Sequence, residues 1–237
     1  MGQAEPTPIQ QSFMIKNGDD LRQDQFALQQ IHVMDHLLKK AGMDLCFTIY
    51  KVVACTYEDG MMEFVPESQT VQQICFDHDY KVSAFLRKLA DNSNGQLSFE
   101  QAQKNYVLSN AGYAVATYFL AVGDRHMENL LVRSNGCLFH CDFGFMFGKH
   151  PPKKGTWIPP IRINKHVVEG MGDQYATFKK TACEAFIELR KHRHFLLDLV
   201  MLMSHYDIKD LQVADCVKQL DEYNERFLPD LSDEDAF

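Results

Sequence analysis

The sequence lacks the features that would indicate secretion or a membrane span. Its seven cysteines form no C-x-x-C pair, the spacing of many redox and zinc sites. The first eleven residues contain no apolar signal core. No apolar run approaches the roughly 20 residues that a transmembrane helix needs. These absences predict a cytoplasmic protein with reduced thiols, whose contact with any membrane is peripheral.

Charge is distributed unevenly along the chain. The formal net charge of −8 argues against general nucleic-acid binding, so we expect no nucleic-acid partner. Residues 143–168, however, contain no acidic residue at all, and we call them the basic island. Its single tryptophan, Trp157, either dips into a lipid interface or anchors a long loop. The basic and histidine residues of the island are Lys149, His150, Lys153, Lys154, Arg162, Lys165 and His166.

The first part of the chain predicts a small sheet with one helix. With 237 residues, 46% of them hydrophobic, the chain can bury a sizeable core. Apolar positions recur at helical spacing from Leu21 until Gly42, which predicts an amphipathic helix with a glycine C-cap. Strands are expected at 12–16, 47–55 and 61–65, with Asp59-Gly60 as the turn between the last two.

The rest of the chain predicts mainly helices. Ser98 followed by Gln101 indicates a capping box at the start of the longest one. Near the end, Ser232 precedes three acidic residues, which is typical of a helix start. Because the chain stops soon afterwards, we expect the helical part to be truncated at its C-terminus. The helices are expected at 70–75, 80–90, 98–122, 174–193, 195–205 and 211–227.

One hairpin interrupts these helices and carries the chemistry. Leu130–Arg133 and Cys137–His140 read as strands joined by an Asn135-Gly136 turn. Folding this hairpin brings together four polar residues that flank it. They are Asp124, His126, Asn129 and Asp142.

These four residue types suit phosphoryl transfer. Asp124 or His126 is placed to accept a proton from an attacking hydroxyl, and spacing does not decide between them. Asn129 and Asp142 offer the oxygen ligands that Mg²⁺ prefers, and Gly144 gives the backbone freedom to present Asp142. The D-x-x-x-x-N spacing followed by D-F-G is more specific than any single residue. The sequence therefore predicts a kinase site that uses ATP and Mg²⁺ or Mn²⁺.

Other residues fit a nucleotide site through their positions. Lys16 lies on a strand and offers an ammonium group to phosphates, although a strand lysine is often only a solvated edge residue. Glu63, Phe64 and Val65 end the small sheet, where a two-lobed kinase presents backbone groups to adenine. Tyr50 either lines the same pocket or belongs to the core. A charged first helical turn explains part of G-D-D-L-R-Q-D at 18–24, but not the order of all seven residues.

Taken together, these motifs resemble the catalytic domain of phosphatidylinositol 3-kinases, over nearly the whole chain from Phe13. The resemblance rests on F-M-I-K with G-D-D-L-R-Q-D, G-D-R-H-x-x-N, F-H-x-D-F-G and E-G-M-G at 169–172. D-L-R-Q-D-Q at 20–25, I-N-K-x-x-V-E-G-M-G at 163–172 and D-L-S-D-E-D-A near the end are most similar to the class III, vacuolar-sorting type.

The resemblance implies an α+β, two-lobed protein-kinase-like fold whose small lobe is incomplete. The expected parts are a tail (1–11), a small-lobe remnant with the hinge at its end (12–65) and a helical large lobe (66–237). Lys16 would contact the ATP phosphates, Asp24 and Tyr50 would line the deep pocket, and Glu63–Val65 would be the hinge. Asn129 and Asp142 would bind metal. The basic island, with Lys149, Lys153, Lys154 and Arg162, would be the activation loop that selects the lipid headgroup.

The implied function is phosphorylation of phosphatidylinositol at the 3-hydroxyl on endosomal and autophagic membranes, together with a regulatory subunit of the class III complex type. Three alternatives stay open: a phosphatidylinositol 4-kinase, a protein kinase of the related large family, and a non-catalytic fragment that keeps the fold. The third is raised because the family's phosphate-covering loop has no counterpart before Phe13. The expected activation loop, with Lys153, Lys154 and Trp157, is more basic than a class III enzyme that acts on an unphosphorylated lipid is expected to be. This favours a phosphatidylinositol 4-kinase or a phosphorylated substrate.

Overall fold

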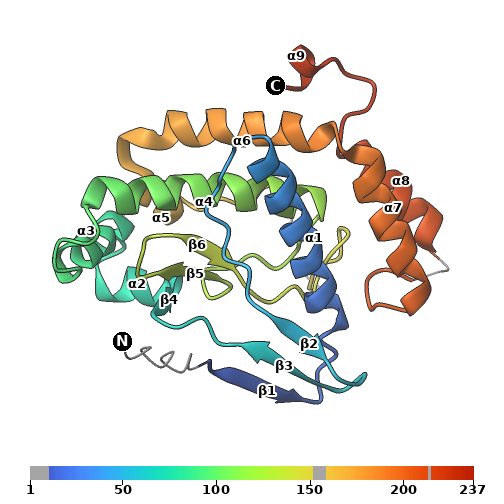
Figure 1. Ribbon diagram of the computed structural model, residues 1–237, viewed down its shortest axis with the longest axis horizontal. Coiled ribbons are helices and arrows are strands. Elements are labelled where there is room, and N and C mark those ends of the chain that lie inside the picture. Colours follow the sequence, from blue (N-terminus) through green and yellow to red (C-terminus); the bar gives the residue numbers. More distant parts are fainter. Residues whose placement is uncertain (1–10, 152–158, 213–214) are drawn as a thin grey trace, which may run out of the picture.

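The computed structural model describes residues 11–151, 159–212 and 215–237, so Lys153, Lys154, Trp157 and residues 1–10 of the expected tail lie outside the described residues. The order of secondary structure (Figure 1) places short strands before and between helices. It runs β1 (Phe13–Asn17), α1 (Arg22–Lys40), β2 (Val52–Ala54), β3 (Asp59–Glu63), β4 (Ser68–Thr70), α2 (Val71–Asp77), α3 (Val82–Asn92), α4 (Phe99–Phe119), β5 (Leu130–Arg133), β6 (Leu138–His140), α5 (Lys165–Met171), η1 (Gly172–Gln174), α6 (Tyr175–Arg190), α7 (Arg193–Met203), η2 (Ser204–Tyr206), α8 (Cys216–Glu225) and α9 (Asp233–Ala236).

The first sheet is antiparallel, with β3 between β1 and β2. Helix α1 packs beside it, and the side chain of Gln25 accepts a hydrogen bond from Ala54 N at 2.9 Å. A Cβ atom at Gly60 would lie 2.7 Å from the carbonyl oxygen of Val53 and 2.8 Å from Leu21 Cδ1. The glycine therefore lets the strands and the start of α1 approach one another closely.

The second sheet contains the predicted hairpin. Strands β5 and β6 pair as expected, and the left-handed Gly136 lies in the turn between them. The Asn135 side chain accepts a hydrogen bond from Cys137 N, which is typical of Asn at a turn. β4 adds a third strand beside β5. It was not predicted because Ser68-Gln69-Thr70 has no apolar alternation.

Helix α4 divides the hydrophobic core (Figure 1). Its C-terminal half, including Tyr113 and Phe119, packs with α1, α6, α7 and α8. Its N-terminal half, including Tyr106 and Val107, packs with α2, α3, α5 and the hairpin. A helix that is buried on most sides has no continuous polar face. Helix α4 also packs directly against β6 of the hairpin.

Two strand predictions in the first sheet were wrong in detail. Residues 47–51 lie outside any strand, so only Val52–Ala54 of the expected strand pairs with β3. Asp59 and Gly60 belong to β3 rather than to the turn. The turn comes earlier because the hydroxyl of Thr56 accepts hydrogen bonds from Glu58 N and Asp59 N.

The helix predictions differ mainly at their ends. Helix α1 stops as expected, since Gly42 N and Met43 N donate to the last turn in the pattern of a Schellman motif. Ser98 caps α4 by accepting from Gln101 N, but the Gln101 side chain donates to Asn105 instead of completing the capping box.

Two helices near the basic island and the C-terminal end were misjudged. Helix α5 was missed; the side chain of Asn164 caps it by accepting from His166 N and Val167 N. Helix α8 begins at Cys216 rather than at Leu211, because Leu211 is bridged to Ile208. The predicted helix start at Ser232 is confirmed, since its hydroxyl accepts from Asp235 N.

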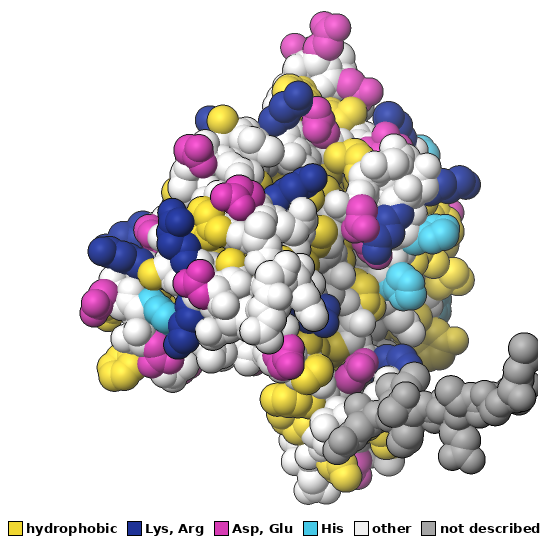
Figure 2. All heavy atoms as spheres, turned by 60° about the vertical axis from the view of Figure 1, so that its left-hand side comes forward, with side chains coloured by type: hydrophobic (Ala, Val, Ile, Leu, Met, Phe, Trp, Pro, Cys, Tyr) yellow, Lys and Arg dark blue, Asp and Glu magenta, His cyan; other side chains and the backbone are white. Residues whose placement is uncertain are grey.

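Charged side chains of both signs are interspersed on the face shown in Figure 2, with hydrophobic side chains between them. Among the helices of the described ranges, none combines the length and apolarity that crossing a bilayer requires.

Candidate active site

The loop after α4 and the segment after β6 are joined by backbone hydrogen bonds. Gly123 N donates to Phe145 O at 2.9 Å, and Phe147 N donates to Leu120 O at 3.0 Å. A Cβ atom at Gly123 would overlap the carbonyl oxygen of Lys149, so this close approach requires a glycine. The two ends of the hairpin are thereby brought together, as the sequence predicted.

Arg125 fastens these two segments from the inside. Its guanidinium group donates to three carbonyl oxygens, those of Gly123, Cys141 and Asp142. The residue is only 8% exposed, and burial lowers the pKa of its guanidinium group. A buried cation that satisfies three backbone oxygens fixes the backbone on both sides of the site.

Asp124 and His126 lie beside each other at the mouth of the site. Asp124 Oδ2 is 3.8 Å from His126 Nε2. His126 Nδ1 accepts a hydrogen bond from Glu128 N at 3.3 Å, so in the neutral ring the proton is on Nε2, facing Asp124. Both side chains are partly exposed. The two candidate proton acceptors therefore lie next to each other.

Asn129 and Asp142 present oxygen atoms that suit a hard cation. Asn129 is 6% exposed and donates its amide N–H to Asp124 O, which leaves Oδ1 without a donor among the described residues. Asp142 is exposed, and its Oδ1 accepts from Gly144 N at 3.1 Å. No cluster of three or more His, Cys, Asp and Glu side chains occurs in the described part of the chain. Mg²⁺ on a nucleotide needs only one or two protein oxygens besides phosphates, so the pair fits it.

Lys16 and Asp24 face the same region from the small sheet and α1. Lys16 Nζ is 2.9 Å from Asp19 Oδ2, and this hydrogen bond, with the charges of Asp24 and Asp142, raises the pKa of Lys16. Asp24 is 7% exposed and accepts from Phe143 N at 2.9 Å. Burial raises the pKa of Asp24 to about 6, and the charge of Asp142 acts in the same direction. The lysine and the two carboxylates thus interact electrostatically.

Tyr50 lies deeper, at the back of this region. Its ring packs edge-on against Phe139, and its hydroxyl donates to His140 O at 3.5 Å. Burial raises the pKa of Tyr50 well above its usual value. Its hydroxyl is therefore inside the protein, in contrast to an ordinary strand tyrosine with its hydroxyl at the surface.

The predicted hinge has most of its backbone groups in use. Glu63 N donates to Lys51 O, and Phe64 N donates to Ser12 O at 2.8 Å. Val65 O accepts from the hydroxyl of Ser68. Among the described residues, no acceptor faces Val65 N, so this amide is left with a free hydrogen-bond donor.

The described part of the basic island borders the catalytic loop. Lys149 and Arg162 are exposed. Between them in sequence, His150 has a buried Nδ1 without a partner in the described ranges. Desolvation and the nearby charge of Arg162 lower the pKa of His150. The exposed Lys149 and Arg162 therefore present two positive charges to solvent.

Sequence reasoning missed three residues that hold the site. Arg125 was hidden between two candidate catalytic residues. Gln23 belongs to the G-D-D-L-R-Q-D run whose order a charged helix turn did not explain. Asp210, which accepts a hydrogen bond from Met146 N at 2.8 Å, carries no local signal at all.

Comparisons with known proteins agree with this geometry. The family model of phosphatidylinositol 3- and 4-kinase matches residues 10–213. The root isoform of phosphatidylinositol 3-kinase from Glycine max is 39% identical over 226 residues, which are 93% of this chain and 27% of the relative. Phosphatidylinositol 3-kinase VPS34 from Arabidopsis thaliana is 38% identical over 226 residues, with the same coverage.

A more distant relative shows the same partial coverage. Phosphatidylinositol 3-kinase VPS34 from Saccharomyces cerevisiae is 35% identical over 228 residues, which are 94% of this chain and 25% of the relative. The chain spans about a quarter of the length of these curated relatives. The predicted resemblance and the α+β, kinase-like fold class are confirmed, and the chain belongs to the phosphatidylinositol 3- and 4-kinase family.

Proposed function

We propose that this chain transfers the γ-phosphoryl group of ATP to the 3-hydroxyl of phosphatidylinositol. The observation that carries the proposal is that one closed hairpin base holds Asn129 beside the Asp124–His126 pair, and that Arg125 ties the backbone of Asp142 to the same loop. Phosphoryl transfer depends on positioning and on electrostatic stabilisation, and this arrangement supplies both.

Each side chain has a role that its surroundings support. Asn129 and Asp142 would hold Mg²⁺ or Mn²⁺, which when bound neutralises charge on the phosphates. Lys16, already among carboxylates, would exchange Asp19 for a phosphate oxygen. Asp124 and His126 would orient the inositol hydroxyl and accept its proton. Val65 N would bind the adenine edge, with Tyr50 and Asp24 behind it.

The basic island supports a membrane lipid as the acceptor. Lys149 and Arg162, which follow the D-F-G motif in sequence, are exposed, and each cation near an anionic leaflet contributes about 1 kcal/mol to membrane binding. We further propose that the protein acts peripherally on endosomal and autophagic membranes. There it would work with a regulatory subunit, as expected for the class III type.

The decisive experiment measures phosphate transfer from labelled ATP to phosphatidylinositol vesicles, with the position of the new phosphate determined. We expect 3-phosphate, and we expect Asp142→Ala and Asn129→Ala each to abolish turnover while leaving the melting temperature close to wild type. Product at the 4-hydroxyl would assign a 4-kinase instead. Transfer to serine peptides would indicate a protein kinase.

A binding measurement separates a silent fragment from an enzyme. ATP with Mg²⁺ should raise the melting temperature of the wild-type chain, and Asp142→Ala should remove that rise. No thermal shift together with no turnover would reduce the chain to a non-catalytic member of the family. Lipid phosphorylation that survives Asp142→Ala would remove the proposed mechanism.

A further inference from the structure

Four backbone groups of residues 143–146 are bonded to side chains from other parts of the chain, in addition to the backbone hydrogen bond from Gly123 N to Phe145 O. Phe143 N donates to Asp24 Oδ1, and Phe143 O accepts from Gln23 Nε2 at 2.8 Å. Gly144 O accepts from Lys209 Nζ, and Met146 N donates to Asp210 Oδ2. The partners come from the first turns of α1 and from residues 204–211, which we call the 204–211 loop.

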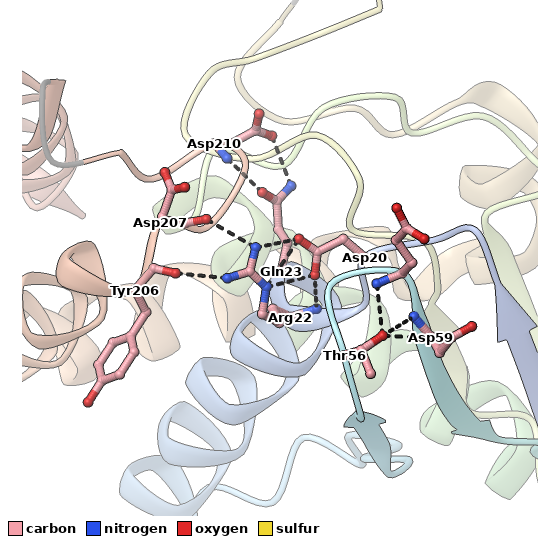
Figure 3. A network of polar contacts seen from close by, with 9 residues as sticks. Asp20, Arg22, Gln23, Thr56, Asp59, Tyr206, Asp207 and Asp210 are labelled. Atoms are coloured by element: carbon pink, nitrogen blue, oxygen red, sulfur yellow. Dashed lines mark hydrogen bonds and ion pairs between the residues drawn. The ribbon is translucent and has the colours of Figure 1, made fainter.

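Gln23 and Asp210 form the centre of this arrangement (Figure 3). Gln23 Nε2 donates to Asp210 Oδ2, and Asp210 N donates back to Gln23 Oε1, both at 2.9 Å. Gln23 is 2% exposed and Asp210 is 6% exposed. No ion pair neutralises Asp210 within the described ranges. Burying such a carboxylate is costly, and a single oxygen that receives two N–H donors offsets that cost.

The 204–211 loop is itself fixed to α1. Arg22 donates to Tyr206 O at 2.9 Å and to Asp207 O at 3.2 Å, and Figure 3 shows its side chain reaching the loop beside Gln23. Ile208 and Leu211 on the loop are buried in the core. Asp210 therefore approaches Met146 from a supported position, and Arg22 contributes to this support without contacting residues 143–146.

Asp142 needs such support because its own backbone is unfavourable. Its φ of 59° lies in the left-handed region, which is unfavourable for most residues other than glycine, and the local hydrogen bond from Gly144 N to the Asp142 carboxylate offsets only part of this cost. Arg125 holds its carbonyl group, while Asp24 and Gln23 hold the next residue on both sides. The direction of the Asp142 carboxylate is thus set by groups that are distant in sequence.

We infer that Gln23 and Asp210 are positioning residues that aim the Asp142 carboxylate by holding residues 143–146. The inference rests on the proposed function for the role of Asp142 as a metal ligand. A displacement of about 1 Å at a catalytic group lowers turnover on the order of 10²-fold. Loss of Asp210 should therefore reduce kcat without changing the lipid KM.

The first test uses the unliganded full chain and does not depend on activity. Hydrogen–deuterium exchange of the peptide covering residues 143–147 should become about tenfold faster in Asp210→Ala, since a buried hydrogen bond is lost. Asp210→Asn keeps an acceptor oxygen and should give a smaller change. Arg22→Gln is the comparison variant: it loosens the same loop without contacting residues 143–146, so it should speed up exchange of this peptide much less than Asp210→Ala.

Turnover supplies the second test. Asp210→Ala should lower kcat about 10²-fold with the KM for phosphatidylinositol unchanged, Asp210→Asn should recover part of it, and Arg22→Gln should lower kcat much less than Asp210→Ala. The inference is overturned if Asp210→Ala and Arg22→Gln behave alike in exchange and in kcat. If exchange changes as expected but the wild-type chain phosphorylates no lipid, the positioning contact stands and the proposed function fails.

Discussion

The catalytic hairpin, residues 129–141, and the segment that follows it, residues 143–146, are neighbours in sequence but are held differently. The hairpin is formed by pairing between β5 and β6 and by its own turn. The segment is held by Asp24, Gln23 and Asp210, which lie 64 to 120 residues away from their backbone partners. Local pairing builds the scaffold of the candidate site, whereas remote side chains hold the segment that follows Asp142, the proposed metal ligand.

Arg125 lies at the junction between the two regions, and its loss should have the largest effect. Arg125→Met leaves three carbonyl oxygens without their donor, which should lower the free energy of unfolding by about 3–5 kcal/mol. Urea denaturation measures this change. Arg22→Met is the comparison variant, because it removes two carbonyl hydrogen bonds in an exposed setting and the ion pair with Asp20, and it should cost about 1–2 kcal/mol. Equal losses in the two variants would contradict a special role for Arg125.

Gly136→Ala tests how firmly the hairpin turn is docked. Gly136 has a φ of 86°, and a Cβ atom there would overlap the carbonyl oxygen of Ala102 on α4. Strain and overlap together should destabilise the protein by about 2–4 kcal/mol. Gly95→Ala is a matched control, since Gly95 has a φ of 81° but no atom within 4 Å of the added group. Its cost should stay near 1–2 kcal/mol, and the difference between the two variants isolates the docking on α4.

Asp24→Asn tests the contact between Asp24 and Phe143 N through the pH dependence of stability. Burial raises the pKa of Asp24 to about 6, so its contribution to stability is complete below about pH 4 and is lost as pH rises through 6. Relative to wild type, the variant should gain about 3 kcal/mol between pH 4 and pH 7, measured by urea denaturation at each pH. The charges of Lys16, Asp19 and Asp142 face the same carboxylate and enter the wild-type value.

A second carboxylate on the same stretch provides an opposite trend. The hydrogen bond from Arg22 lowers the pKa of Asp20, so its contribution is present at neutral pH and is lost in acid. Asp20→Asn should therefore lose stability relative to wild type as pH rises through the acid range below about 4, the usual pKa of an aspartate. If the stability of Asp24→Asn relative to wild type also fell as pH rose, hydrogen bonds and charges from its neighbours, and not burial, would dominate the pKa of Asp24.

The same comparison explains what the sequence could predict. The hairpin was predicted with nearly its observed limits, because strand alternation and an Asn-Gly turn are local signals. Asp124, His126, Asn129 and Asp142 were placed together for the same reason. Their individual roles remain predictions, as do the hinge at Glu63–Val65 and the three expected parts of the chain.

Long-range contacts could not be predicted from local patterns. Nothing in the sequence around Asp210 distinguishes it from a surface aspartate, since its hydrogen-bond partners, Gln23 and Met146, are distant in sequence. Residues 47–51 of the strand expected at 47–55 are not a strand, for a related reason. The β-branched and aromatic residues there favour a strand, but Tyr50 is used in the core against Phe139 instead.

Lys209→Met should have the smallest effect, because it tests an exposed contact to residues 143–146 where the other variants test buried ones. Lys209 is exposed; its Nζ donates to Gly144 O at 2.9 Å and lies 4.7 Å from the centre of the Phe145 ring. Because water replaces both contacts readily, the loss should be about 0.5–1 kcal/mol. Lys218→Met, which removes a surface pair with Glu222, is the control and should cost less than about 0.5 kcal/mol. If Lys209→Met lowered the free energy of unfolding as much as Arg125→Met, the surface contact of Lys209, and not the buried Gln23 and Asp210, would be the main support of residues 143–146.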